Sequence, residues 1–432
     1  MKVTAIIGGN ASGKTLFVEK MRKQMASDKV RYMAFRDSYG VGTDQAYYLQ
    51  LRWNQHDIDT ETPNTGQLLE QAFLLTGPDN EERREWQRHI VRLLGMDTFL
   101  DKYIITLSSG ELRKFQLAKT LLAQPETLIL DNPFIGLDSE ARDLLRDLLL
   151  QLAKEQGMEI YLVVSRKADI PNYTTDIINI KELPENDCPG LSEEKRQAIL
   201  NLPHEGKEYC AEEVVNMNKV SIRYGDRTIL KDLDWRIMNG EHWVLSGQNG
   251  SGKSTLLSLI SADNPQGYAC DISLFGHRRG SGESIWEIKR HIGYVSPEMH
   301  RSYHRDLPAL HIVASGLKDT VGLYIRTTEA ERDCCRWWMD IFGIGHLANR
   351  SFLKMSSGEQ RLVLLARAFV KDPELLILDE PLHGLDASNR QLVKDIIDTY
   401  CQRKNKTLIF VSHYKEERPK CIDHEKLLTF KR

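Results

Sequence analysis

LILDNPFIGLDS, at residues 128–139, returns almost unchanged as LILDEPLHGLDA at residues 376–387. Each stretch begins with a short apolar run that ends in aspartate, which is typical of a buried strand followed by a functional turn. The residue after that aspartate is Asn132 in the first stretch and Glu380 in the second. Only the glutamate can accept a proton, so the repeat predicts two related sites with unequal chemistry.

The match extends well beyond these two stretches and indicates the duplication of a whole domain. LSSGELRKFQLAKTLLAQPETLILDN (107–132) recurs 248 residues later as MSSGEQRLVLLARAFVKDPELLILDE (355–380). AIIGGNASGKT (5–15) recurs 239 residues later as VLSGQNGSGKS (244–254), so the second copy has nine extra residues between the two motifs. A period of this length belongs to a domain and not to a solenoid repeat.

The chain therefore divides into three segments. Residues 1–182 form a first domain, residues 183–213 a polar linker with a short helical pattern at 193–202, and residues 214–432 a second domain. Inside each copy, apolar strands alternate with stretches of helical period, which predicts a mainly parallel sheet flanked by helices, an α/β fold.

Bulk composition excludes several classes of protein. With 41 % hydrophobic and 28 % charged residues, the chain of 432 residues is globular and not disordered. Its formal net charge of −3 gives no general attraction for nucleic acid or for an anionic membrane. No apolar run is long enough to span a bilayer. The seven cysteines contain no CxxC pair and indicate a reducing, cytoplasmic setting.

Two glycine-rich loops match the P-loop pattern G-x4-G-K-[ST]. Each follows an apolar strand and precedes a helical run, so backbone N–H groups and a helix N-terminus can hold the phosphates of ATP. The lysine reaches the β- and γ-phosphates, and the Thr15 or Ser254 hydroxyl binds Mg²⁺. A chance glycine turn is the alternative for either loop alone. The residues concerned are Gly8, Gly9, Asn10, Ala11, Ser12, Gly13, Lys14 and Thr15, then Gly247, Gln248, Asn249, Gly250, Ser251, Gly252, Lys253, Ser254 and Thr255.

Asp131 and Asp379 each end a four-residue apolar run. A carboxylate at the end of such a strand faces the ion bound near the phosphate loop, so both are predicted Mg²⁺ ligands. A turn or N-cap aspartate is the structural alternative.

The combination of these motifs resembles the ATP-binding cassette (ABC) ATPases over nearly the whole chain. SSGE at 108–111 and 356–359 is similar to the signature of that family, IGLD and HGLD to its D-loop, and VSHY at 411–414 to its switch-histidine loop. The resemblance implies two P-loop nucleotide-binding domains in tandem, each with a parallel-sheet core and a helical subdomain. An antiparallel β-subdomain is clear only in the second copy, because the first begins at its phosphate-loop strand.

In that family two nucleotide domains pair head to tail, which here implies an intramolecular pair. Each ATP then lies between one P-loop and the opposing signature, whose helix N-terminus can face the γ-phosphate. The signature residues are Ser356, Ser357 and Gly358 for the site of Lys14, and Ser108, Ser109 and Gly110 for the site of Lys253. Tyr224 is at the position of the aromatic residue that stacks on adenine, with a plain sheet-face tyrosine as the alternative.

The resemblance assigns the catalytic roles to Glu380, as the base that activates water, and to His413 at the γ-phosphate. The first copy has Asn132 for the glutamate and Arg166 in VVSRK for the histidine. Two losses at one site predict that it binds ATP and hydrolyses it slowly or not at all. The alternative is that another side chain serves as its base.

Other positions are less well determined. The glutamine loop is Gln50, with Gln55 as the alternative, in the first copy, and in the second Pro297 and Glu298 stand there. His300 and His304, four residues apart, are predicted to lie in a solvated loop or to contact a partner, and a metal pair is the alternative. RWWMDIF (336–342) predicts the apolar face of a helix in the helical subdomain, and an exposed docking patch for a membrane partner is its alternative.

Within the family, similar stretches occur in tandem ATP-binding proteins of molybdenum transport. This implies an ATP-binding subunit of a molybdate-type transporter, cytoplasmic or peripheral on the inner face of the membrane, with an integral-membrane permease as partner. A soluble tandem factor acting on the ribosome, and a regulatory ATP-binding module without a permease, are the alternatives. There is no clear nucleic-acid signature. The sequence names neither the cargo nor the direction of transport.

Overall fold

The structure is a computed structural model of the chain in which two compact units are described, Met1–Pro184 and Glu185–Arg432. The described residues are 2–8, 14–25, 27, 29–34, 63–104, 107, 109–134, 137, 139–180, 190–202, 211–224, 227–248, 250–297, 299, 303, 306–320, 327–412 and 414–429.

The first unit is built on a five-stranded parallel sheet with the strand order β2-β3-β4-β1-β5. Its strands are β1 (Lys2–Ile7), β2 (Val30–Ala34), β3 (Thr127–Asp131), β4 (Glu159–Val164) and β5 (Asp176–Asn179). Its helices are α1 (Lys14–Gln24), α3 (Thr65–Leu75), α4 (Glu81–Leu93), α5 (Ser109–Leu121) and α6 (Ser139–Glu155).

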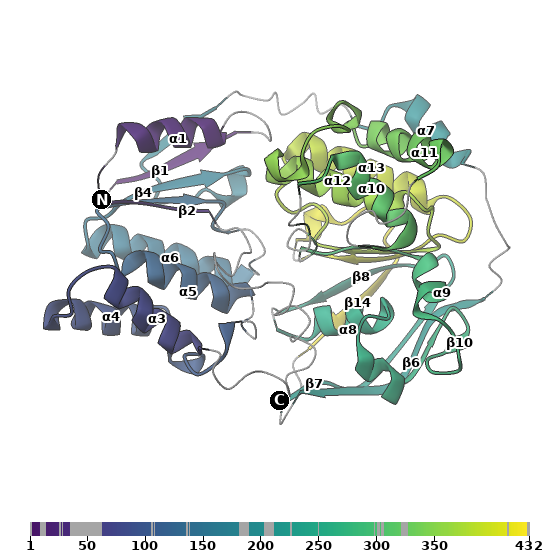
Figure 1. Ribbon diagram of the computed structural model, residues 1–432, viewed down its shortest axis with the longest axis horizontal. Coiled ribbons are helices and arrows are strands. Elements are labelled where there is room, and N and C mark those ends of the chain that lie inside the picture. The colour runs from purple at the N-terminus through teal and green to yellow at the C-terminus, as the bar shows by residue number, and fades with distance from the viewer. Residues whose placement is uncertain are drawn as a thin grey trace. The chain divides into compact units, whose positions relative to one another are not determined.

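Helices cover both faces of this sheet, and successive side chains along a strand point to opposite faces (Figure 1). Val3 and Ile7 of β1 belong to a core that contains residues of α5 and α6, whereas Ile6 packs with Val18 of α1 on the other face. Both faces are therefore buried, as a parallel sheet with crossover helices requires.

The second unit contains the same parallel sheet and a further, antiparallel one. The parallel order is β11-β12-β13-β8-β14 and the antiparallel order is β10-β9-β6-β7. The strands are β6 (Glu213–Tyr224), β7 (Arg227–Met238), β8 (His242–Gly247), β9 (Asp271–Leu274), β10 (His277–Arg278), β11 (Ile292–Val295), β12 (Leu375–Asp379), β13 (Thr407–Val411) and β14 (His424–Leu428). The helices are α7 (Glu193–Leu200), α8 (Lys253–Ile260), α9 (Ile285–Arg290), α10 (Ala309–Ser315), α11 (Glu329–Ile341), α12 (Ser357–Phe369) and α13 (Ala387–Cys401).

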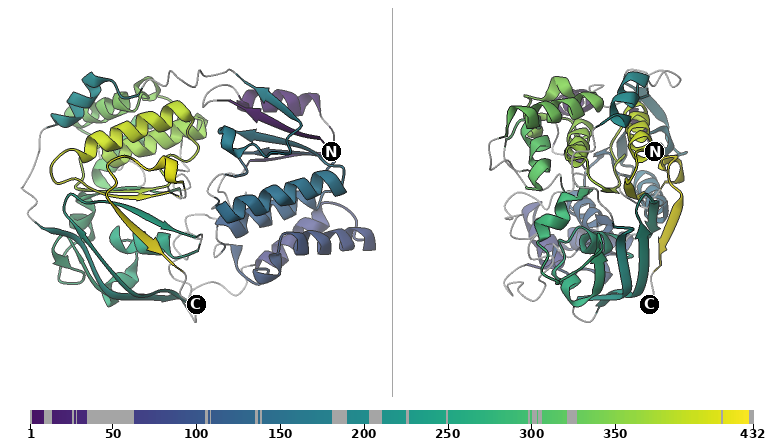
Figure 2. Two further views of the ribbon diagram at one scale, coloured as in Figure 1. Left: turned by 180° about the vertical axis from the view of Figure 1, so that it is seen from behind. Right: turned by 90° about the vertical axis from the view of Figure 1, so that its right-hand side faces the viewer.

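The two parallel sheets correspond strand for strand, with the phosphate-loop strands β1 and β8 at the same place in each order. The predicted tandem of α/β domains with parallel-sheet cores is confirmed. The antiparallel sheet was expected only in the second copy, and within the described ranges only the second unit has one. It lies on one side of the parallel sheet together with α8, and α12 and α13 cover the other side (Figures 1 and 2).

Part of the predicted linker is packed into the second unit. Helix α7 contacts α13, and the side chain of Ile199 is fully buried there. The backbone N–H of Leu191 donates to Oδ2 of Asp395 at 3.1 Å. The domain boundaries remain a prediction, but the segment from residue 190 to α7 is held by the second unit.

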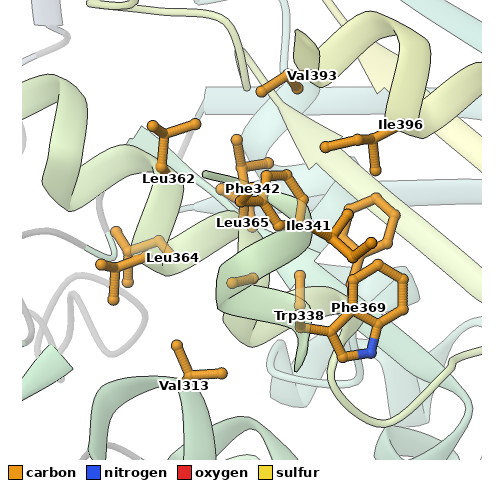
Figure 3. Close-up of a cluster of buried hydrophobic side chains, with 14 of the residues drawn as sticks. Val313, Trp338, Ile341, Phe342, Leu362, Leu364, Leu365, Phe369, Val393 and Ile396 are labelled. Carbon is orange, nitrogen blue, oxygen red and sulfur yellow. The ribbon is translucent and has the colours of Figure 1, made fainter. Parts of the chain in front are cut away.

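The helical subdomain of the second unit packs around a tryptophan. Trp338 of α11 is 1 % exposed, and its ring centroid lies 5.2 Å from that of Phe369 and 6.3 Å from those of Phe342 and Tyr400 (Figure 3). Met339 and Ile341 are also buried. The prediction that residues 336–342 form the apolar face of a helix is confirmed, and the alternative of an exposed docking patch is wrong for these three side chains.

Candidate functional site

The phosphate loop of the second unit joins the end of β8 to the start of α8, and glycines shape it. The φ angles of Gly250 and Gly252 are +81° and +95°, a region that residues with a Cβ seldom adopt. A Cβ on Gly252 would also lie 2.9 Å from Cδ2 of Leu230. Glycine at 252 therefore allows the loop to pass close to β7.

Polar groups of this loop are arranged for an anion. Nζ of Lys253 donates to the carbonyl oxygens of Gly247 at 2.6 Å and Gln248 at 2.9 Å, which holds the ammonium over the loop. Helix α8 begins without a side-chain cap, so its first N–H groups are available to an anion. The Ser251 hydroxyl is buried and has no hydrogen-bond partner among the described residues. Because such orphaned groups are rare, the loop fits a phosphate ligand.

We expect Gly252→Ala to weaken ATP binding about tenfold or more in a Lys14→Ala background, where only the second loop binds. The left-handed φ costs about 1–2 kcal/mol for a residue with a Cβ, and about 1.4 kcal/mol corresponds to one decade of affinity. Titration with ATP measures the effect. Gly240→Ala is the matched control, because its φ is +85° and no atom lies within 4 Å of the added Cβ. Equal affinities of the two variants would contradict the prediction.

The phosphate loop of the first unit is described only at its ends. Gly8 follows β1, Lys14 begins α1, and Nζ of Lys14 donates to the carbonyl oxygen of Gly8. Lys253 makes the same contact with Gly247 in the second unit. Thr15 is the second residue of α1. The predicted residues Gly9, Asn10, Ala11, Ser12 and Gly13 lie outside the described residues.

The two predicted Mg²⁺ ligands are the last residues of corresponding strands, Asp131 in β3 and Asp379 in β12. The hydroxyl of Tyr32, on the neighbouring strand β2, donates to Oδ2 of Asp131 at 3.0 Å. Tyr294 occupies the same register in β11 beside β12. Carboxylates at the carboxyl edge of a parallel sheet are well placed for a hard cation.

The residue after each aspartate has an uncommon backbone conformation. Asn132 has φ of +54° and Glu380 φ of +48°. Their N–H groups donate to the carbonyl oxygens of Val163 at 2.8 Å and Val411 at 3.0 Å. Asparagine tolerates the left-handed region, whereas glutamate is uncommon there. Both copies keep this turn, so the asparagine and the glutamate follow the aspartate in the same backbone conformation.

The side-chain amide of Asn132 is hydrogen-bonded to neighbouring residues. Its Nδ2 donates to Oδ1 of Asp131 at 2.8 Å, and the Ser165 hydroxyl points to its Oδ1 at 3.4 Å. An amide in this position can orient a water molecule but cannot take up its proton.

The structure corrects the residue predicted at the switch-histidine position of the first unit. Asp131 pairs with Val163, and Asp379 pairs with Val411. His413 follows Val411 by two residues, so its counterpart is Ser165 and not Arg166. The alignment of Arg166 with His413 relied on the serine that precedes each of them. That alignment is shifted by one residue from the register of the strands. The first unit still has no imidazole at this position.

A buried arginine that was not predicted from the sequence supports the turn that carries Glu380. Arg361 of α12 is 2 % exposed, and its guanidinium donates to the carbonyl oxygens of Asp379, Glu380, Pro381 and Ser296. Arg113 is at the matching position of α5, 248 residues earlier, and is also buried. An arginine kept three residues after the signature glycine in both copies is the signal that could have identified it.

A second missed residue contacts the predicted base. Nδ1 of His383 lies 3.3 Å from Oε2 of Glu380, and both side chains are largely buried. In the sequence His383 is the first residue of the HGLD motif, and nothing in that motif predicts this contact.

The signature of the second unit forms a capping box at the start of α12. The Ser356 hydroxyl accepts from the Glu359 N–H at 3.3 Å, and Oε2 of Glu359 accepts from the Ser356 N–H at 2.7 Å. The box leaves the N–H groups of Ser357 and Gly358 as the other donors of the first turn. In the first unit, Ser109 and Gly110 are the first two residues of α5, and Ser108 lies outside the described residues.

Of the remaining predicted residues, some are described by the structure and others are not. Tyr224 ends β6 in a half-buried position, and its hydroxyl accepts from Nδ2 of Asn264 at 3.0 Å. Ser254 is exposed and Thr255 half-buried in the first turn of α8. Pro297 follows Ser296, a partner of Arg361. The predicted residues that lie outside the described part of the chain are Gln50, Gln55, Asn249, Glu298, His300, His304 and His413.

Comparison with known proteins agrees with this geometry. A family model described as "ABC transporter" matches residues 1–135 and 230–383. The ABC transporter ATP-binding protein ModF of Escherichia coli is 35 % identical, with 97 % of this chain and 90 % of ModF aligned. An uncharacterized ABC transporter ATP-binding protein of Schizosaccharomyces pombe is 26 % identical over the same shares of the two chains.

A solved structure shares the tandem fold at low identity. The archaeal ribosome recycling factor aABCE1, solved in complex with the ribosomal stalk protein aP1, superposes with a TM-score of 0.53 at 18 % identity, over 99 % of this chain and 83 % of that chain. None of the helices in the described ranges has the length and apolar character needed to cross a membrane. With a family model matched in both copies, and with a relative aligned over almost its whole length, the chain belongs to the ABC transporter family and is a tandem ATPase that binds ATP.

Proposed function

We propose that the two copies form two composite ATP sites in head-to-tail arrangement, one hydrolytic and one that mainly binds. The first site combines Lys14, Thr15 and Asp131 with Ser356, Ser357 and Gly358. The second combines Lys253, Ser254, Asp379, Glu380 and His413 with Ser108, Ser109 and Gly110. The first-turn donors of Ser357 and Gly358 support this proposal, because the capping box leaves them to an external anion.

The observation that carries the asymmetry is the pair Glu380 and Asn132 in otherwise matching turns. At the second site Glu380 accepts the proton of the attacking water, while Lys253 and the N-terminus of α8 hold the phosphates. Ser254 and Asp379 would hold Mg²⁺, which neutralises phosphate charge when bound. The first site keeps its lysine and aspartate and lacks a proton acceptor at the turn, so it retains ATP.

The biological role that we propose is that of the ATP-binding subunit of a transport system at the cytoplasmic face of a membrane. The relative ModF, an ABC transporter ATP-binding protein aligned over 97 % of this chain, supports this role. The resemblance of the sequence to tandem ATP-binding proteins of molybdenum transport suggests an oxyanion of the molybdate type as cargo. A permease is then the membrane partner. The fold likeness to a ribosome recycling factor motivates the alternative of a soluble factor on the ribosome.

A trapping experiment tests this role. The Glu380→Gln protein, loaded with ATP, is captured from detergent-solubilised membranes and from cleared lysate of the native organism. We expect an integral-membrane permease to copurify. The matched control is Lys14→Ala/Lys253→Ala, which should not retain it. Molybdate uptake by vesicles that contain the captured complex identifies the cargo. Copurifying ribosomes would favour the alternative, and turnover near background without any partner would indicate a regulatory module.

A further inference from the structure

His383 and Glu380 meet because the chain turns back on itself after β12. The N–H of His383 donates to the carbonyl oxygen of Glu380 at 3.1 Å, and Gly384 follows with φ of +75°. This turn brings Nδ1 of His383 to 3.3 Å from Oε2 of Glu380. This distance is that of an ion pair, and since an ionised carboxylate can only accept, the imidazole would be the donor of any hydrogen bond between the two side chains.

The backbone of Glu380 is held by hydrogen bonds, so the contact with His383 acts on its side chain. The N–H of Glu380 is fixed on Val411, and its carbonyl oxygen accepts from Arg361. With the main chain held on both sides, the side-chain torsions of Glu380 determine where its carboxylate lies. The side chains of Glu380 and His383 are 17 % and 19 % exposed, so the contact is shielded from water and worth more than one on the open surface.

The duplication supplies an internal comparison. Ile135 is the counterpart of His383, 248 residues earlier, and Asn132 is the counterpart of Glu380. The copy that lacks the carboxylate thus also lacks the histidine, although the following Gly-Leu-Asp is the same in both copies. Isoleucine cannot donate a hydrogen bond. The Gly-Leu-Asp motif therefore does not need a histidine before it. In this chain the histidine is present in the copy that has the glutamate.

We propose that His383 is a positioning residue for the base. It donates to Oε2 of Glu380 and so leaves Oε1 to face the attacking water. This inference rests on the proposed function of Glu380 and extends it to a neighbour that does not itself contact the nucleotide. A carboxylate held in one orientation reacts more often than a rotating one, because misplacement by about 1 Å can cost about 10² in rate.

The test is ATP turnover by His383→Ala. We expect kcat to fall about 10- to 100-fold, with KM for ATP unchanged within about twofold, because the contact orients the base and does not bind the nucleotide. His383→Asn should restore most of kcat, since its amide nitrogen can donate from nearly the position of Nδ1. His383→Leu fills similar space without a donor and should behave as the alanine variant. Thermal unfolding of each variant verifies that the fold is retained.

A double-mutant cycle separates this inference from the proposed function. In a Glu380→Gln background, His383→Ala should cause no further loss, because both changes act through one group. If Glu380→Gln keeps full turnover, the proposed function itself fails. If Glu380→Gln is inactive while His383→Ala turns over at more than half of the normal rate, only the positioning role is wrong. An asparagine variant as slow as the leucine variant would also overturn it.

Discussion

Glu380→Gln is expected to lower kcat for ATP hydrolysis by about 10²–10⁴, the usual contribution of a general base. Glutamine keeps the shape of the side chain and can accept a hydrogen bond from water, but it cannot take the proton. ATP binding should stay within about twofold, because Lys253 and the N-terminus of α8 are unaffected. Steady-state phosphate release and equilibrium ATP binding, measured on the same preparation, separate the two quantities.

The duplicated copy provides the matched control for this prediction. Asn132→Gln changes the corresponding residue of the first unit, which has the same left-handed turn and no base. We expect turnover within about twofold of the parent protein, because the first site contributes little hydrolysis. Comparable losses from Glu380→Gln and Asn132→Gln would show that both sites contribute to turnover and would reject the asymmetric arrangement.

Trp338→Ala is expected to destabilise the second unit by about 3–5 kcal/mol, the usual cost of truncating a large buried aromatic residue. Its indole lies among Phe342, Phe369 and Tyr400 in the core of the helical subdomain. The close packing of these rings prevents full collapse around the vacated volume. Urea unfolding followed by far-UV circular dichroism measures the change, and the transition that shifts is the one that belongs to this unit.

A surface tryptophan of the same unit is the control. Trp286 in α9 is 56 % exposed, so Trp286→Ala should change the unfolding free energy by about 0.5 kcal/mol or less. A loss below about 1 kcal/mol for Trp338→Ala would be inconsistent with its burial in a packed core.

The motifs that depend on consecutive residues could be predicted from the sequence. A phosphate loop is specified by glycines, a lysine and a hydroxyl within eight positions, and Asp379 ends a short apolar run that is typical of a buried strand. The parallel cores followed from the repeated alternation of strands and helices. The two unit cores also share their strand order, which the nearly constant spacing of the repeat had implied.

Features that depend on register or on side-chain contacts could not be predicted in this way. Ser165 was missed because a shared serine offered a match one residue away from the true strand pairing. The contact of His383 with Glu380 depends on a turn whose geometry no single residue specifies. The packing of α7 on α13 joins residues about 200 positions apart in sequence, and the buried Ile199 and the hydrogen bond from Leu191 to Asp395 show it only in the structure.

The position of Arg361 has a consequence for communication within the molecule. This guanidinium connects the helix that begins with Ser357 and Gly358 to the turn that carries Glu380. In the proposed arrangement the N-terminus of α12 contacts the ATP bound at the first site. The turn that carries Glu380 takes part in hydrolysis at the second site. A shift of α12 on nucleotide loading would then move the carbonyl oxygens that hold the base, and occupancy of the silent site would regulate the rate of the active one. The nucleotide that is cleaved slowly or not at all would thus act as an effector bound in place.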